Sequence, residues 1–493
     1  MYLLGIDVGS SSVKVAIVRA KDGAVMSLVQ HPSVEMNIMS VAPGYAEQDP
    51  EMWWQNTQTA IGNALAQSGV DGKEIQSIGI SYQMHGLVVV DKNQNVLRPS
   101  IIWCDSRAVE IGNNAFSELG EKFCLDNYLN SPGNFTASKL RWVKENEPDI
   151  YAKIDKIMLP GDFINMKLTG EINTSISGLS EGIFWNFKEN RLATKLMDHY
   201  EIDEQIIAEY LPSMSDQGTI KKEVAEKLHL NPNIKVTYRA GDQANNALSL
   251  GVLEPNEVAA TGGTSGVIYG VIDQYATDEL SRVNNFAHVN HTDDEKRLGV
   301  LLCINGAGSQ YAWIKNQIAN NGIDYTEIEK EVAKIPVGSE GLRLIPFGNG
   351  AERMLNNKNK GATLTNLQFY RHKREHIYRA ALEGIAFSFA YGFELLKNFG
   401  LDPSVIKVGN DNLFRSQVFS ETVATLLDTT IEVMDTSGAV GAAKASGIEI
   451  GIYADSQEFA HMITAERTIT PHHNKEPYVN AYLDWKVEVD QIK

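Results

Sequence analysis

The sequence predicts an α/β protein of more than one domain, and three features support this. Apolar, strand-like runs alternate with helical patterns along the whole chain, which is typical of α/β folds. At roughly 150 residues per domain, a length of 493 residues corresponds to two or three domains. Two segments with hairpin patterns also lie about half a chain apart, which suggests a duplicated architecture.

The first hairpin is expected over residues 3–18, where two β-rich apolar runs flank the small-residue turn Gly9–Ser12. The second is expected over residues 258–271, with its turn at Thr261–Gly266. Because Gly- and Ser-rich turns between strands are common, coincidence is the alternative to duplication.

The other elements follow in chain order from caps and apolar patterns. Asp49 and Pro50 suit the N-cap and first position of a helix through Met52. The pattern breaks at residues 253–256, so we expect a domain seam within residues 241–256. Strands are expected at 78–81, 87–91 and 430–434, and helices at 376–389, at 412–427 and after Ser437-Gly438.

Composition and charge exclude several classes of protein. Hydrophobic residues make up 43% and charged residues 22% of the chain, which is globular composition and excludes a disordered or fibrous protein. A formal net charge of -18 argues against nucleic acid or an anionic membrane surface as a partner.

Cysteine usage and apolar runs predict a cytoplasmic location. Cys104, Cys124 and Cys303 are odd in number and widely spaced, which argues against a disulfide framework or a zinc site. No apolar run approaches the ~20 residues of a membrane span. The chain enters a strand pattern at Tyr2 with no basic region before it, unlike a signal peptide.

The two predicted turns are candidates for binding phosphate. Neither the P-loop nor the G-x-G-x-x-G pattern occurs, so a nucleotide would need another device. Backbone N–H groups of a tight turn such as Gly9–Ser12 form an anion-binding concavity, and Thr264 in the second turn could act from the opposite side. Asp7, before the first turn, could hold Mg²⁺ through water; a simple turn residue is the alternative.

Two further segments contain candidate reactive groups. Asp242 follows Gly241 at the start of a predicted helix of small residues, and the positive helix N-terminus is expected to keep its carboxylate ionised, as a general base requires. The alternative is a plain N-cap. Gln83, Met84 and His85 end a predicted strand, where ligand sites are often found; a purely structural histidine is the alternative.

Taken in order, these segments resemble the FGGY family of carbohydrate kinases, within the sugar kinase/actin/Hsp70 superfamily. At Met84-His85 the sequence is similar to the members that phosphorylate xylulose, whereas members that phosphorylate glycerol carry Arg-Glu there. The segments that match extend along most of the chain: Gly5–Lys14, Glu47–Trp54, Gln83–Gly86, Leu97–Arg107, Phe135–Val143, Gly241–Gln243, Gly262–Gly266, Gly350–Arg353 and His376–Phe387.

The resemblance implies an α/β fold of two ribonuclease-H-like (actin-like ATPase) domains flanking a central catalytic cleft. Residues 1–245 would bind the sugar and carry the first phosphate hairpin, and residues 246–493 would bind ATP. The implied reaction is ATP- and Mg²⁺-dependent phosphorylation of a ketopentose, with D-xylulose converted to D-xylulose 5-phosphate in pentose catabolism as the first expectation. The expected partners are the sugar and ATP, and a homodimer is possible.

The resemblance also assigns roles to individual residues. Asp242 would be the catalytic base, and Asp7 and Asp242 would face the metal. The sugar would contact Met84, His85, Gln243 and Asn134. The nucleotide would contact Ser10, Ser11, Ser12, Lys14, Gly263, Thr264, Gly308, Gly409 and Asn410.

Two departures from the family keep alternatives open. Relatives usually have three glycines where this chain has Gly409-Asn410-Asp411, and they often place an aromatic residue at the position of Asn134. One alternative is therefore a kinase of the same family for another ketose, a polyol or a sugar acid. A second is a nucleotide-binding relative without catalysis, and a third is an α/β enzyme that uses no nucleotide.

Overall fold

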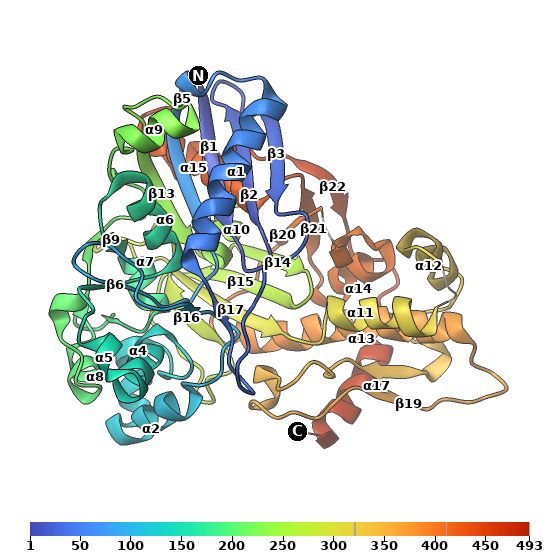
Figure 1. Ribbon diagram of the computed structural model, residues 1–493. Helices are drawn as coiled ribbons and strands as arrows, with labels where there is room; N and C mark the ends of the chain where they lie inside the picture. The colour runs from blue at the N-terminus through green and yellow to red at the C-terminus, as the bar shows by residue number, and fades with distance from the viewer. Residues whose placement is uncertain (320–321, 411, 493) are drawn as a thin grey trace.

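The computed structural model describes residues 1–319, 322–410 and 412–492. Two β-sheets organise the chain, one from each half of the sequence (Figure 1). The first sheet has the order β13-β5-β1-β2-β3, formed by Lys235–Gly241, Ile75–Tyr82, Tyr2–Val8, Val13–Arg19 and Val25–His31. The second has the order β16-β17-β15-β14-β20-β21-β22, formed by Asn284–Ala287, Leu298–Ile304, Gly266–Ile272, Val258–Gly262, Val405–Gly409, Thr430–Met434 and Ala465–Ile469.

The two sheets repeat one topology. In the first, β1, β2 and β3 form an antiparallel meander, and β5 and β13 continue parallel to β1. In the second, β14, β15 and β17 form the meander, and β20 and β21 continue parallel to β14. Strands β16 and β22 extend the second sheet at its edges. Both predicted hairpins are thus confirmed, and their duplication is not a coincidence.

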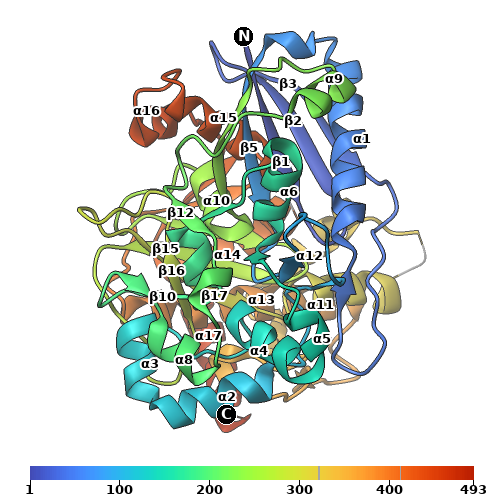
Figure 2. The same cartoon turned by 60° about the vertical axis from the view of Figure 1, so that its left-hand side comes forward.

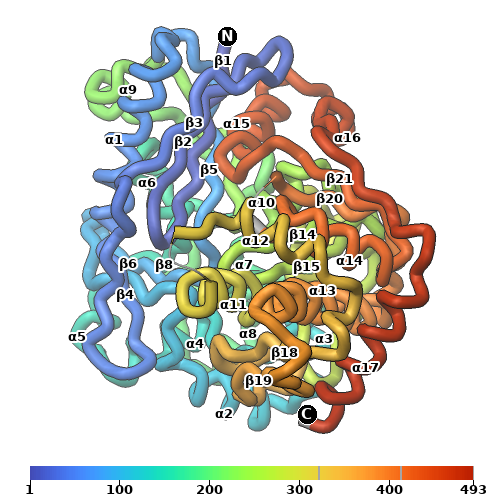
Figure 3. Tube along the Cα trace, turned by 90° about the vertical axis from the view of Figure 1, so that its right-hand side faces the viewer, coloured from blue at the N-terminus to red at the C-terminus, as the bar shows by residue number. Residues whose placement is uncertain are grey.

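Helices cover both faces of the first sheet. On one face lie α1 (Pro50–Ser68) and α6 (Pro160–Thr169). The side chain of Asp49 accepts the N–H of Glu51 at the start of α1, as the cap pattern predicts. On the other face lie α10 (Asp242–Ser249) and α15 (Gly438–Glu449), as Figures 1 and 3 show.

Helices α10 and α15 lie between the two sheets. A single buried cluster joins their alanines to side chains from β1, β2 and β13 of the first sheet and β14, β15 and β21 of the second. The backbone of α15 rests directly on the first sheet. A Cβ added at Gly5 would lie 1.9 Å from the carbonyl oxygen of Ala439, and one at Gly79 would lie 2.0 Å from that of Ala442. Only glycine permits this approach.

The second sheet is covered by α13 (Arg374–Lys397) and α14 (Gln417–Leu427), and α17 (Glu476–Ile492) packs on these two helices. Helix α13 confirms the helix predicted at 376–389 and is longer at both ends. The helix predicted at 412–427 is interrupted: a 3₁₀ turn spans Asn412–Arg415, and Ser416 then caps α14 by accepting the N–H of Phe419. The strand predicted at 430–434 and the helix after Ser437-Gly438 are confirmed as β21 and α15.

A long insertion between β5 and β13 contains most of the helices of the N-terminal half. Figure 2 shows its helices α2, α3, α4, α5 and α8 gathered at the end of the molecule opposite the N-terminus. No helix among the described residues is long and apolar enough to cross a membrane. Besides α6, the insertion contains α2 (Val109–Leu119), α3 (Glu121–Tyr128), α4 (Thr136–Asn146), α5 (Pro148–Tyr151), α7 (Ile176–Glu181), α8 (Thr194–His199) and α9 (Lys222–Leu228), with the short strands β6 (Val88–Val90) and β8 (Lys156–Met158).

Candidate active site

A cavity of about 260 Å³ opens where three parallel strands of the first sheet end. Strands β1, β5 and β13 run in the same direction, so the residues at their carboxyl ends meet at one edge of the sheet. The lining residues come from these strand ends, from the turn after β1 and from one loop: Asp7, Gly9, Ser10, Ser11, Ser12, Lys14, Gln83, Trp103 and Asp242. Residues far apart in sequence therefore form one site.

Asp7 and Asp242 bring two carboxylates to this cavity. Asp7 accepts a hydrogen bond of 2.9 Å from the hydroxyl of Ser81 and lies opposite Lys14 in the hairpin register. Burial raises the pKa of Asp7, while Lys14 and Ser81 oppose the rise. Asp242 begins α10, and burial together with the charge of Asp7 raises its pKa to about 7. Desolvation and the like charge of Asp7 therefore oppose the helix field, which was expected to keep Asp242 ionised.

The turn after β1 is closed by the Gly9 N–H, which donates to the carbonyl of Ser12 at 3.0 Å. Two neighbouring side chains hold Ser10 of this turn in place. The amide of Gln48 donates to the carbonyl of Ser10 at 2.7 Å, and the indole N–H of Trp103 lies 3.4 Å from the hydroxyl oxygen of Ser10. The structure thus gathers Ser10, Ser11, Ser12 and Lys14 around the two carboxylates.

Met84 and His85 follow β5 and lie beside the cavity. Met84 is buried and packs on Gly241, where an added Cβ would lie 2.7 Å from the Met84 Cγ. His85 has a left-handed backbone with φ of 62°. Its N–H donates to the carboxylate of Glu181 at 3.2 Å, and its ring Nδ1 lies 3.0 Å from the backbone carbonyl of Glu181.

The protonation state of His85 follows from these contacts. A carbonyl can only accept, so Nδ1 must carry the hydrogen and Nε2 is left as an acceptor. Burial and the charge of Lys139 lower the pKa of His85 to about 3, which keeps the ring neutral. His85 therefore offers a hydrogen-bond acceptor that suits a hydroxyl donor.

Gln243 and Asn134 are placed differently from each other. The Gln243 side-chain nitrogen lies 3.4 Å from Asp242 Oδ1, so this residue stands beside the candidate base. Asn134 donates its amide to the backbone carbonyl of Asp105 and does not line the cavity. Its Oδ1 is buried without a hydrogen-bond partner among the described residues.

The nucleotide candidates of the C-terminal half lie at the second sheet. The N–H of Gly308 donates to the carbonyl of Gly263 at 3.1 Å, and Ser309 donates likewise to Thr264 at 2.9 Å. The structure therefore joins the second hairpin turn to the start of α11 (Gly308–Trp313). None of these residues lines the cavity of the first sheet.

Gly409 and Asn410 stand at the end of β20. The Asn410 side chain donates to the carboxylate of Glu466 at 2.8 Å, and its backbone N–H donates to Met434. This side chain is thus held toward the edge strand β22. Asp411 lies outside the described residues.

The structure adds three residues that the site assignment from sequence missed. Trp103, half exposed, lines the cavity, and its signal was its place in the Leu97–Arg107 segment that resembles the family. Lys139 and Glu181 are buried and contact His85. Burial lowers the pKa of Lys139 to about 7 and raises that of Glu181. No local pattern points to these two, because their contacts are all distant in sequence.

Comparison with known proteins agrees with this geometry. Residues 2–249 match the N-terminal domain of the FGGY family of carbohydrate kinases, and residues 258–449 match its C-terminal domain. The chain therefore belongs to the FGGY family of carbohydrate kinases. It is an enzyme family whose members are kinases, so the class of reaction is phosphoryl transfer from ATP to a carbohydrate.

Particular relatives match over most of their length. A xylulose kinase of Bacillus subtilis is 29% identical over 477 residues, covering 94% of this chain and 91% of the relative. One of Lactococcus lactis is 30% identical over 389 residues, covering 78% and 75%.

Solved structures share the fold. A xylulose kinase of Rhodospirillum rubrum superposes with a TM-score of 0.89 at 24% identity, covering 100% of this chain and 99% of that one. A glycerol kinase of Plasmodium falciparum solved with ADP superposes with a TM-score of 0.89 at 19% identity, covering 100% and 98%. The prediction of two actin-like ATPase domains is confirmed.

Proposed function

We propose that this protein transfers the γ-phosphoryl group of ATP to D-xylulose and forms D-xylulose 5-phosphate. The observation that carries the proposal is the shared cavity of Asp7, Asp242 and the first hairpin turn, beside Met84 and His85. The choice of sugar is supported by the relatives named xylulose kinase, which include one that matches 94% of the chain.

Asp242 is proposed as the catalytic base. Its carboxylate would orient the attacking hydroxyl of the sugar and accept its proton. A pKa of about 7 suits this role, because a base is most effective when its pKa lies near the working pH. Phosphoryl transfer depends mainly on positioning and charge neutralisation, so the alignment of the hydroxyl with the phosphoryl group is the larger contribution.

His85, Met84 and Gln243 are proposed to position the sugar. The Nε2 atom of His85 would accept a hydrogen bond from a sugar hydroxyl, and Met84 would offer an apolar surface next to the base. Trp103 would cover the open carbon chain of the sugar from the opposite loop, since the 5-hydroxyl of a ketopentose is free only in the open-chain form. Asn134 is proposed to act through its Oδ1, which needs a donor such as a hydroxyl.

The residues present fit a magnesium ion. Asp7 raises the pKa of Asp242, and a divalent cation would relieve this repulsion between two carboxylates. No group of three or more His, Cys, Asp or Glu side chains suited to a metal occurs in the described part of the chain, so phosphate oxygens and water would supply the other ligands, as Mg²⁺ prefers. When bound, Mg²⁺ would neutralise phosphate charge; Asp7 and Asp242 would hold it.

The division of labour between the halves is also a proposal. Residues 1–245 would bind the sugar and contact the phosphates through Ser10, Ser11, Ser12 and Lys14. Residues 246–493 would bind ATP through the second hairpin turn, Gly308 and the end of β20. The proposed ATP-binding residues of this half are Gly263, Thr264, Gly308, Gly409 and Asn410. A cytoplasmic location and a homodimer stay predictions.

The test is ADP release by purified protein with Mg-ATP, measured with D-xylulose, L-xylulose, D-ribulose, L-ribulose, glycerol, gluconate and no sugar. We expect D-xylulose to give the highest kcat/KM by at least an order of magnitude. A preference for another acceptor would keep the reaction and replace the sugar. ATP binding without turnover on any acceptor would contradict the proposal and favour a non-catalytic relative.

A further inference from the structure

We propose that Lys139 is a positioning residue of the acceptor site: its ammonium group binds the carbonyls of His85 and Ile102 and so fixes the spacing of His85 and Trp103. The inference rests on the proposed function of these side chains as sugar contacts. Among the described residues, the Lys139 side chain makes no hydrogen bond to one that lines the cavity. It acts through two loops beside the cavity: the first contains His85, and the second contains Ile102 and Trp103.

The contacts of Lys139 are specific. It lies in α4 with none of its surface exposed. Its Nζ donates to the carbonyl of His85 at 2.8 Å and to the carbonyl of Ile102 at 3.0 Å. A buried ammonium group is costly unless it is paired and hydrogen-bonded. The two carbonyls accept its hydrogen bonds, and the charges of Asp105 and Glu181 oppose the effect of burial on its pKa.

The first loop, which follows β5, contains His85, whose backbone conformation must be held by its neighbours. His85 has a left-handed backbone, and this conformation is unfavourable for a residue with a Cβ atom. Such strain persists only where the surroundings hold it, and it is common at ligand sites. Glu181 holds the N–H and the ring of His85, and Lys139 holds its carbonyl. The direction of the His85 ring thus depends on both neighbours.

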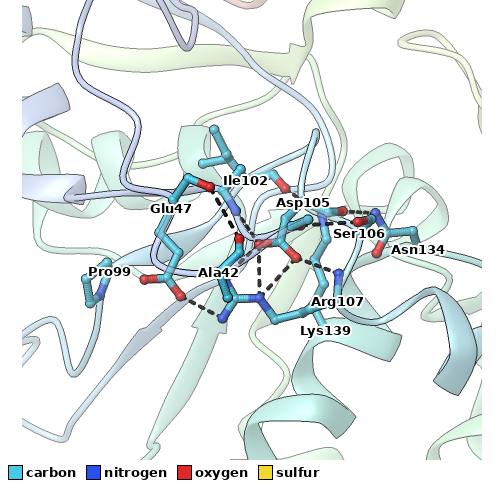
Figure 4. Close-up of polar contacts among 12 residues, drawn as sticks. Ala42, Glu47, Pro99, Ile102, Asp105, Ser106, Arg107, Asn134 and Lys139 are labelled. Atoms are coloured by element: carbon cyan, nitrogen blue, oxygen red, sulfur yellow. Dashed lines mark hydrogen bonds and ion pairs between the residues drawn. The ribbon is translucent and has the colours of Figure 1, made fainter. Parts of the chain in front are cut away.

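The second loop runs from Ile102 through Trp103 to Asp105. At Asp105 it is held by a buried ionic cluster, shown in Figure 4. The Asp105 carboxylate accepts the N–H of Ala46 at 2.6 Å and two hydrogen bonds from the Arg107 guanidinium at 3.0 Å and 2.7 Å. Arg107 also pairs with Glu47 at 2.7 Å. Trp103 lies between this anchor and Ile102, the residue that Lys139 binds.

Lys139 therefore contacts both loops at once. Without its ammonium group, the carbonyls of His85 and Ile102 lose their charged donor, and His85 can leave its left-handed backbone. Trp103 would lose its support on one side, while the Asp105 cluster would still hold the other. The candidate nucleotide groups of the C-terminal half lie on the second sheet. In the first half, the Gly9–Ser12 turn keeps its closing hydrogen bond and the contact of Gln48 with Ser10, so we expect the geometry of both groups to change little.

The experiment compares Lys139→Met with Lys156→Met. Lys156 is the control because its Nζ also bridges two carbonyls, those of Gln205 and Ile207, in the same half of the chain, but at a partly exposed position. We expect Lys139→Met to raise the KM for D-xylulose by about 10- to 100-fold, as for loss of hydrogen bonds to a charged group. The KM for ATP and the sugar-independent ATP hydrolysis should stay within twofold, and Lys156→Met should leave all three within twofold.

A second readout follows the His85 ring directly. In ¹⁵N-histidine-labelled protein, assigned with His85→Asn, the wild-type ring should show hydrogen on Nδ1 and none on Nε2. We expect Lys139→Met to mix the two tautomers at His85. The ring of His288 is an internal control, because its Nε2 faces the carbonyl of Val252 and its Nδ1 faces the hydroxyl of Tyr269, which gives it the opposite tautomer.

Equal rises in both KM values, or wild-type kinetics with an unchanged His85 signal, would overturn the proposal. If Lys139→Met does not fold, Lys139→Gln, which keeps a donor for one carbonyl, is measured in its place against the same two criteria. If the wild type does not phosphorylate D-xylulose, the proposed function fails, and the His85 tautomer still decides whether Lys139 positions that ring.

Discussion

The two hairpins of this molecule occupy the same place in the repeated topology and differ in charge. In the first, Asp7 pairs with Lys14 one step before the turn. In the second, Thr261 pairs with Val267 at the corresponding step. The duplicated fold therefore supplies two similar turns, but only the first has a carboxylate and an ammonium group at this position. We infer that the charged chemistry belongs to the first half, and that the second half binds mainly through backbone and hydroxyl groups.

The sharpest test of this difference is Asp242→Asn. We expect kcat to fall by about 10²–10⁴-fold, the usual contribution of a general base. Because burial and the charge of Asp7 raise the folded-state pKa from 3.8 to about 7, the fold loses stability as pH rises from 3.8 to about 7, where the unfolded chain is ionised at Asp242 and the folded chain is not. The Asn variant should thus melt no lower than the wild type at pH 8. Near wild-type turnover would remove Asp242 from the role of base.

The two hairpins can be compared by matched substitutions. We expect Asp7→Asn to lower kcat/KM for Mg-ATP by about 100-fold, since a charged ligand to the cation is lost. Thr261→Val at the equivalent step should change it by less than about threefold, because it removes one neutral hydroxyl. Steady-state kinetics at several Mg²⁺ concentrations check both. Equal losses in the two variants would show that the halves share the charged chemistry.

The substitution His85→Ala tests the proposed sugar-binding part of the first half. Loss of a buried hydrogen-bond acceptor for a sugar hydroxyl should raise the KM for D-xylulose by about 10-fold or more. The KM for ATP should change little, because the hydrogen bond of the His85 ring goes to Glu181 and not to a candidate nucleotide residue of either half. Initial rates with each substrate varied separately give both constants. A parallel rise in the two would take His85 out of the sugar site.

The pH profile tests how the two carboxylates interact. The reaction needs ionised Asp242, so kcat/KM for the sugar should fall as pH drops through about 7. Asp7→Asn removes the like charge that raises this pKa, so its acidic limb should move to lower pH. The profile of the residual activity measures this shift. A limb that does not move would mean that burial alone sets the pKa of Asp242.

The smallest effect is expected from Asn410→Gly in the second half. Its side chain is engaged by Glu466, so its removal should change the KM for ATP by less than about threefold, as for an exposed polar contact. The KM for the sugar should not change. Isothermal titration with Mg-ADP gives an independent value of the nucleotide affinity. A large gain in affinity would show that Asn410 crowds the nucleotide, as its departure from the glycines of relatives suggests.

Much of the fold was predictable because its signals are local. The small-residue turns, the Asp49 cap and the apolar runs each depend on a few neighbouring residues, and the corresponding elements are confirmed. The helix expected at 412–427 was wrong in its first part, since Ser416 starts α14 only after a separate turn. The gathering of Asp7 and Asp242 followed from family resemblance; parallel strand ends provide the physical reason.

The sequence by itself determined the α/β class, the two hairpins and the residue types available for chemistry, because these follow from short-range patterns. Only the tertiary structure decided the state of those residues. The raised pKa of Asp242 comes from burial and from Asp7, distant in sequence. The tautomer and backbone of His85 come from Glu181 and Lys139. Desolvation and long-range contacts set these properties, and both exist only once the chain has folded.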